Sequence, residues 1–156
     1  MPECKNAGFD SDIELVVFSV EDVICGLRID EVQEIKRVSK ITKVFHAPAY
    51  VRGVINLRGQ IVTVIDLRSK FNYETGDIGK MSRIVVVSRG SEQIGLLVDN
   101  IEDAMIARSQ DIMPPPSNLR GANRCFFSGV YKAPETLVAI LDLKEILKKD
   151  STDENQ

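Results

Sequence analysis

Apolar and polar side chains alternate along most of this chain in short runs rich in β-branched residues, a pattern typical of β-strands. We predict strands at residues 14–20, 23–29, 50–57, 60–65, 83–88, 93–98, 126–131 and 137–141. Short polar or glycine-bearing breaks separate neighbouring runs at residues 21–22, 58–59, 90–91 and 133–135. Breaks of this length between strands predict hairpins.

The strand pattern occurs twice. Residues 16–35 align without a gap on residues 85–104, an offset of 69, and residues 50–71 align on residues 126–147, an offset of 76. Two copies are too few for a solenoid, so we predict a mainly β protein of two small barrels related by internal pseudo-symmetry. Because a unit of roughly 60 residues is marginal alone, the two units are expected to share apolar surface along a seam.

Helical signals are short and lie at equivalent places in the two copies. Asp66 and Asp142 precede the segments 66–71 and 142–147, and aspartate is a good helix N-cap, so a short helix is predicted to close each unit. Asp30 and Asp99 open the segments 30–35 and 99–104, where we predict a single helical turn or bend.

The folded region is expected to span residues 13–148. It divides approximately into 13–75 and 76–148, and strands are able to exchange between these subdomains. Residues 1–12 and 149–156 are polar and unpatterned, which predicts disordered tails.

Composition narrows the class of protein further. The chain has 156 residues, of which 44% are hydrophobic, as expected for a globular protein with a real core. Cys4, Cys25 and Cys125 are an odd number without short ligand spacing, which argues against a disulfide framework and against a metal site. No run is long enough for a signal sequence or a membrane span, so a cytoplasmic protein without membrane insertion is expected.

Catalytic chemistry has little support in the sequence. His46 is the only histidine, and neither a nucleophile elbow nor a nearby cysteine accompanies it. Asp99, Glu102 and Asp103 crowd one segment, but the pattern of a calcium loop is absent, as are the glycine-rich loops that hold nucleotides. We therefore predict a protein that is not an enzyme and has no cofactor.

A nucleic-acid-binding barrel is the alternative function. A basic excess surrounds Lys36, Arg37, Lys40 and Lys43. Against it, aromatic residues make up only 6% of the chain and there is no tryptophan to stack on bases. Binding to random single strands that falls steeply with salt would favour this alternative.

The two copies differ most at one hairpin, where residues 55–60 face residues 131–136. A tight type I′ or related turn explains Gly59, which can adopt a positive φ. It does not explain Arg58. An arginine at a hairpin tip is either a donor for a partner's carboxylate or carbonyl groups, or a solvent-facing residue that keeps the turn soluble.

Residues 51–62 and 64–68 closely resemble the signature of the CheW family of bacterial chemotaxis coupling proteins. Residues 32–35, 95–99 and 141–147 resemble this family too, so the resemblance covers about residues 13–148. It implies a single CheW-like domain of two intertwined five-stranded barrels of the Src-homology-three type. It also implies a non-enzymatic adaptor that links the cytoplasmic tips of methyl-accepting chemoreceptors to the histidine kinase CheA, without nucleic acid as a partner.

The resemblance also assigns roles to positions of this chain. It implies receptor and kinase contacts at Val32, Glu34, Ile35, Arg58, Ile101 and Ala104, with Gly53, Asn56, Gly59 and Gly95 supporting the binding loop. In the repeat, Val32 is equivalent to Ile101, and Ile35 is equivalent to Ala104. These apolar residues are therefore expected to line two sides of the seam. Recruitment from the cytoplasm to membrane-associated receptor arrays is the location that the resemblance implies.

Overall fold

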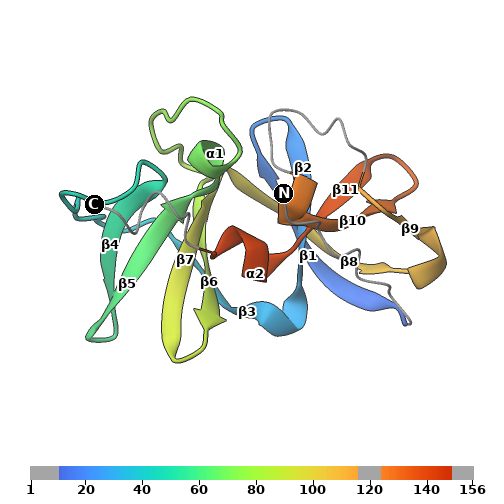
Figure 1. The fold of residues 1–156 in the computed structure, drawn as a ribbon, viewed down its shortest axis with the longest axis horizontal. Coiled ribbons are helices and arrows are strands. Elements are labelled where there is room, and N and C mark those ends of the chain that lie inside the picture. Colours follow the sequence, from blue (N-terminus) through green and yellow to red (C-terminus); the bar gives the residue numbers. More distant parts are fainter. Residues whose placement is uncertain (1–10, 116–123, 149–156) are drawn as a thin grey trace.

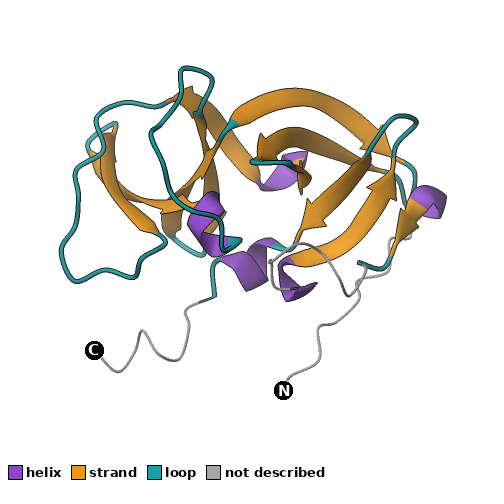
Figure 2. Ribbon diagram, turned by 90° about the horizontal axis from the view of Figure 1, so that it is seen from above, coloured by secondary structure: helices purple, strands orange, loops and turns teal. Residues whose placement is uncertain are grey.

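The computed structural model describes residues 11–115 and 124–148. Nearly all of each tail expected to be disordered, residues 1–10 and 149–156, lies outside these ranges. Two strongly curved sheets lie side by side, and the helices α1 (Leu67–Lys70) and α2 (Leu143–Ile146) lie between them (Figure 1, Figure 2). The predicted mainly β class with a two-part layout is confirmed.

The strands include every one that the alternating pattern predicted. In chain order the described elements are β1 (Ile13–Val20), β2 (Val23–Arg28), the 3-10 helix η1 (Ile29–Glu31), β3 (Val32–Arg37), β4 (Val51–Leu57), β5 (Gln60–Asp66), α1 (Leu67–Lys70), β6 (Arg83–Arg89), β7 (Glu92–Val98), β8 (Asn100–Ala107), η2 (Ser109–Asp111), β9 (Ile112–Met113), η3 (Arg124–Phe126), β10 (Phe127–Lys132), β11 (Leu137–Leu141) and α2 (Leu143–Ile146).

Strands exchange between the two halves of the chain, as the sequence analysis allowed for its approximate division near residue 75. One sheet has the order β8-β1-β2-β11-β10-β9, and the other has the order β3-β6-β7-β5-β4. By repeat equivalence, β1, β2, β3, β4 and β5 correspond to β6, β7, β8, β10 and β11. Each sheet therefore combines the first two strands of one copy with the last three of the other, which is a symmetric exchange.

Strand register shows that the two sheets are built alike. In the antiparallel hairpins, Val17 faces Gly26 in one sheet, and Val86 faces Gly95 in the other, at the offset of 69. The parallel pairing of β11 with β2 joins Ala139 to Cys25, and its counterpart joins Thr63 to Ile94. The internal repeat read from the sequence is thus a repeat of hydrogen-bonded pairs.

The chain leaving one edge of each sheet crosses to pair with the opposite edge. After β3, Thr42 makes an isolated antiparallel bridge with Val54 of β4, with N···O distances of 2.8 Å in both directions. After β8, the short strand β9 pairs with β10, where Met113 faces Val130. Val130 is the repeat equivalent of Val54. Both sheets are thereby curled by the same connection.

The predicted helix caps are confirmed, whereas the two predicted helical turns are only partly right. Aspartate caps the closing helices as expected, because Asp66 Oδ1 accepts from Arg68 N at 3.0 Å and Asp142 Oδ1 accepts from Glu145 N at 3.3 Å. The predicted turn at residues 30–35 shrinks to η1 and continues as β3, and residues 100–107 form β8 rather than a helical turn. The backbone there pairs with β6 and β1, and sheet pairing outweighs the local capping signal.

Three clusters of buried side chains hold the fold together. One small cluster fills the interior of each sheet. The largest lies between the sheets and draws on both of them, and it contains Phe18, Leu27, Phe71, Val85 and Leu141. Phe71 contacts Phe127 with ring centroids 5.5 Å apart. The shared apolar surface expected at the seam is therefore a core common to both sheets.

Two further observations bear on the sequence analysis. Cys25 is a free, buried thiol, whereas Cys125 is disulfide-bonded, which the argument against a disulfide framework did not predict. An odd cysteine count does not prevent one pair from forming. Within residues 11–115 and 124–148, no helix has the length and apolar character to cross a membrane.

Candidate functional site

The hairpin between β4 and β5 is a rigid two-residue turn. Arg58 has φ of 51° and Gly59 has φ of 83°, and two positive values in succession define the type I′ geometry. The Oδ1 of Asn56 accepts a hydrogen bond from the N–H of Gly59 at 2.9 Å. Asn56 and Gly59, expected to support the binding loop, therefore hold the backbone that presents Arg58.

The side chain of Arg58 stands out from the turn and meets Glu34. Arg58 Nη2 lies 2.9 Å from Glu34 Oε2, and the two side chains are 72% and 28% exposed. Glu34 lies on β3, at the opposite edge of the five-stranded sheet from β4. The ion pair thus spans the gap between the two edges and leaves most of the Arg58 side chain exposed.

Glycines support this hairpin and its sheet through close packing. Gly53 has φ of 153°, and a Cβ there would collide with the carbonyl oxygen of Thr42. This close approach permits the bridge from Thr42 to Val54. At Gly95, a Cβ would lie 2.7 Å from Ile84 Cγ2 inside the sheet. A larger residue at either position would disrupt this close packing.

Val32 and Ile101 occupy equivalent places at the seam. Val32 faces Val87 across the β3–β6 pairing, and Ile101 faces Phe18 across the β8–β1 pairing. Each of the two is half-buried and packs against the shared core. They anchor their edge strands to this core, and part of each side chain remains accessible.

Ile35 and Ala104 are the exposed members of the predicted apolar set. Ile35 is 39% exposed and faces Val85, whereas Ala104 is exposed and faces Val16. They lie on β3 and β8, the edge strands of different sheets. Of the six predicted contact residues, the structure pairs Arg58 with Glu34 directly and distributes the four apolar residues over two equivalent edges.

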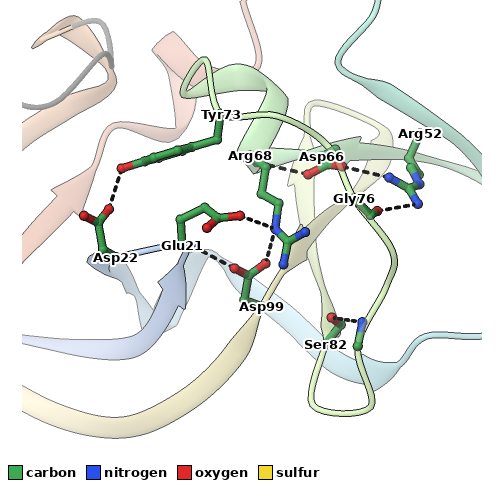
Figure 3. Close-up of polar contacts among 10 residues, drawn as sticks. Glu21, Asp22, Arg52, Asp66, Arg68, Tyr73, Gly76, Ser82 and Asp99 are labelled. Carbon is green, nitrogen blue, oxygen red and sulfur yellow. Dashed lines mark hydrogen bonds and ion pairs between the residues drawn. The ribbon is translucent and has the colours of Figure 1, made fainter.

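Sequence reasoning missed an ionic cluster that joins the two sheets, referred to below as the clamp. Its centre is Arg68 on α1, whose Nε lies 2.8 Å from Asp99 Oδ1 and 3.2 Å from Glu21 Oε1 (Figure 3). The backbone N–H of Glu21 donates to Asp99 Oδ2 at 2.7 Å. Its hydrogen bond to Asp99 raises the pKa of the Arg68 guanidinium above its ordinary value.

Further polar contacts extend the clamp on both sides. Asp66, which is nearly fully buried, accepts from Arg52 at 3.2 Å, and Arg52 also donates to the carbonyl of Gly76 at 3.1 Å. Tyr73 donates its hydroxyl to Asp22 at 2.6 Å (Figure 3). Glu21 and Asp22 form the β1–β2 turn of one sheet, whereas Arg68 and Tyr73 follow β5 of the other. In sequence, Glu21 and Arg68 differ from their repeat equivalents Gly90 and Lys144, whereas Asp99 matches Asp30, and only the fold brings the three clamp residues together.

Comparison with known proteins shows which family has these features. The CheW-like domain model matches residues 14–151. Among curated relatives, the chemotaxis protein CheW of Helicobacter pylori is 33% identical over 138 residues, which are 88% of this chain and 83% of that protein. The chemotaxis protein CheW of Klebsiella aerogenes is 27% identical over 146 residues, covering 94% and 88%.

A solved structure gives the same result for the fold. The scaffolding protein TtCheW from Thermoanaerobacter tengcongensis superposes with a TM-score of 0.81 at 29% sequence identity, over 95% of this chain and 96% of that one. The resemblance seen in the sequence is thus confirmed over nearly the whole chain. The chain belongs to the CheW-like domain family.

Proposed function

We propose that this protein is a non-enzymatic adaptor that couples methyl-accepting chemoreceptors to the histidine kinase CheA. Membership of the CheW-like family supports a role in coupling chemotaxis components. The observation that carries the proposal is the preorganised Arg58, fixed by a type I′ turn and mostly exposed. A donor fork held in this way recognises a carboxylate or backbone carbonyls without a large ordering cost.

Arg58 and Glu34 form the polar part of the proposed contact surface. The two opposite charges lie 2.9 Å apart, so a partner that carries a carboxylate and a cation can bind Arg58 and Glu34 in place of their contact with each other. Arg58 is well exposed, so solvent screens the pair and its contribution to folding is small. We therefore assign the Arg58–Glu34 pair a role in specificity for the kinase or receptor surface.

Four apolar residues form the second part of the proposed surface. Ile35 and Ala104 are exposed on the edge strands β3 and β8, and Val32 and Ile101 lie on the same two strands with their side chains packed against the shared core. A receptor helix presents apolar anchors at helical spacing, which fits an apolar contact surface of this kind. Well-packed residues beneath exposed ones provide the rigidity that binding hot spots need.

The shared core suits an adaptor that passes a signal between partners. Because the exchanged strands and the common cluster tie the sheets together, a displacement at one sheet acts on the other. Single contacts are expected to be weak, and many simultaneous contacts in a receptor array give the strength. We place the protein in the cytoplasm, recruited to membrane-associated arrays.

The proposal is tested by comparing Arg58→Ala with a matched control, Arg108→Ala, which removes an exposed arginine next to β8 of the other sheet. Affinity for the regulatory domain of CheA and for a receptor-tip fragment is measured by calorimetry, and thermal unfolding is measured in parallel. Loss of a charge-assisted contact of about 1.5–3 kcal/mol lowers affinity about 10- to 100-fold. We expect this loss for Arg58→Ala alone, with an unchanged melting temperature. Unchanged affinity for both partners would contradict the proposal, and equal losses of stability and affinity would assign Arg58 to the fold.

A further inference from the structure

The two ends of the seam are equivalent by pseudo-symmetry but differ in chemistry. The repeat relates Arg68 of α1 to Lys144 of α2, and it relates Asp99 to Asp30. At the first end, Arg68 is held by two carboxylates in the clamp. At the second end, Lys144 has no hydrogen bond or ion pair to any residue in the described ranges.

The reason is that one of the two carboxylates of the clamp is missing at this end and the other has a different partner. Asp30 turns instead to Arg28, whose Nη2 lies 3.2 Å from its Oδ2. Gly90 takes the place of Glu21 and has no side chain. The backbone is the same in the two hairpin turns, because φ is 53° at Glu21 and 61° at Gly90. Only the glutamate side chain is missing from the second end.

A pocket occupies the second end. Its volume is about 600 Å³. We call it the α2 pocket, and it is lined by Glu31, Ser88, Arg89, Gly90, Leu143, Lys144, Leu147 and Lys148. No Cβ contact restricts Gly90, since nothing lies within 4 Å of the position that its Cβ would take.

The charge of the α2 pocket is positive, with three cations against one carboxylate. Arg89 is fixed by donating to the carbonyl of Leu147 at 2.8 Å, and Lys148 lies 4.0 Å from Glu145, a long separation for an ion pair. Burial is the main cause that raises the pKa of Glu31 above its ordinary value. This wall of the pocket is therefore partly shielded from water, which strengthens charge interactions within it.

A second pocket adjoins the charged one, and its lining is mainly apolar, with Glu92 as its one carboxylate. Its volume is about 350 Å³, and Arg89 and Leu147 line both pockets. The other lining residues include Tyr50, Ile94 and Ile146. A ligand that carries a carboxylate next to an apolar group would match the two pockets in order.

We propose that the α2 pocket binds an aspartate or glutamate side chain of a partner protein. The partner's carboxylate lies beside Lys144 as Glu21 lies beside Arg68, and a neighbouring apolar side chain of the partner fills the adjoining pocket. This surface borders the start of β3 through Glu31, but its lining contains neither Arg58 and Glu34 nor the four apolar contact residues, so it does not depend on the contacts proposed above. We infer a carboxylate as the ligand because carboxylates bind Arg68 at the equivalent place in the clamp.

The test uses 4-methylpentanoate as the probe, because it joins one carboxylate to a leucine-like chain, and 4-methylpentanamide as its uncharged match. Backbone amide shifts of the full chain are followed by two-dimensional NMR as each probe is added. We expect saturable shifts at Gly90, Lys144 and Leu147 with the carboxylate, and at least tenfold weaker binding of the amide.

Variants separate this site from nonspecific binding. Gly90→Glu restores the missing side chain in a backbone conformation that Glu21 already adopts, and it is expected to abolish probe binding. Gly90→Ala bears the same backbone cost without a carboxylate and retains binding. Lys144→Gln loses binding at least tenfold, whereas Lys132→Gln, an exposed lysine on β10, retains it.

Several results would overturn the proposal. Absence of saturable shifts, or equal binding of the carboxylate and the amide, would remove the carboxylate site. Persistent binding to Gly90→Glu would place the probe elsewhere. The same shifts on raising the protein concentration without probe would assign the pocket to a second copy. If the same shifts appear when residues 149–156 are removed, these residues are the occupant of the α2 pocket.

Discussion

Replacing Arg68 by methionine tests whether the clamp stabilises the seam. Methionine keeps an unbranched apolar stem and removes the guanidinium, which lies 2.8 Å from Asp99 and 3.2 Å from Glu21. The side chains of Arg68 and Asp99 are 21% and 22% exposed. A hydrogen bond between charged groups contributes about 1.5–3 kcal/mol, and partial exposure reduces this value through solvent screening. Because the variant also leaves two carboxylates facing each other, we expect a loss of about 2 kcal/mol.

The matched control is Lys144→Met, the repeat-equivalent change on α2. Lys144 has no ion pair among the described residues, so its replacement is expected to cost less than about 0.5 kcal/mol. The free energy of unfolding is measured by urea denaturation at low salt and at about 1 M salt, where the Debye length falls to about 3 Å. We expect the difference between the variants to shrink at high salt. Equal costs for the two variants would refute the stabilising role of the clamp.

The remaining predictions concern packing and ionisation. Gly53→Ala is expected to cost more than about 3 kcal/mol, because its Cβ meets Thr42, whereas Gly59→Ala, with open space around it, costs about 1 kcal/mol; equal shifts in melting temperature would contradict this ordering. Val64→Ala and Leu141→Ala each remove a buried side chain and are expected to cost about 2–4 kcal/mol in urea denaturation, and unchanged unfolding would show that the core is misassigned. Burial raises the pKa of the Cys25 thiol, so the unfolded chain releases its proton first. The contribution of the thiol to the free energy of unfolding is therefore fully present below the unfolded thiol pKa of about 8.5, and it falls by about 1.4 kcal/mol per pH unit above that pKa. Denaturation of the wild type and of Cys25→Ala between pH 7 and 10 should show this slope in the wild type alone.

The repeat and the strands were predictable because they depend on local alternation. Val16, Gly26 and their partners at the offset of 69 carry the same pattern in both copies, and the same pattern produced the same hydrogen-bonded register. The caps at Asp66 and Asp142 were equally local, since each side chain bonds to a backbone N–H two or three residues away.

The exchange of strands was not decided by local signals. Residues 100–107 contain exposed acidic positions and an aspartate just before them, which favour a turn when read alone. Their pairing with β1 lies far away in the sequence, and only the complete sheet makes it favourable. The clamp was missed for the same reason, because Glu21, Arg68 and Asp99 are distant in the chain and meet only after the exchange.

The candidate contact residues depended on the family resemblance rather than on physical reasoning from the residues. The turn at Arg58 was derivable from Gly59, but the approach of Glu34 was not, since it joins opposite edges of a curled sheet. Ile35 and Ala104 likewise became equivalent edge positions only through the fold.

The most direct test of the adaptor role is the amount of kinase bound to receptor as the concentration of this protein is raised. An adaptor with separate surfaces for two partners first increases kinase retention on receptor-containing membranes and then decreases it, because excess adaptor saturates each partner separately. We predict this rise and fall in a sedimentation assay with fixed amounts of kinase and receptor. Kinase retention that does not change with the concentration of the protein would contradict the account.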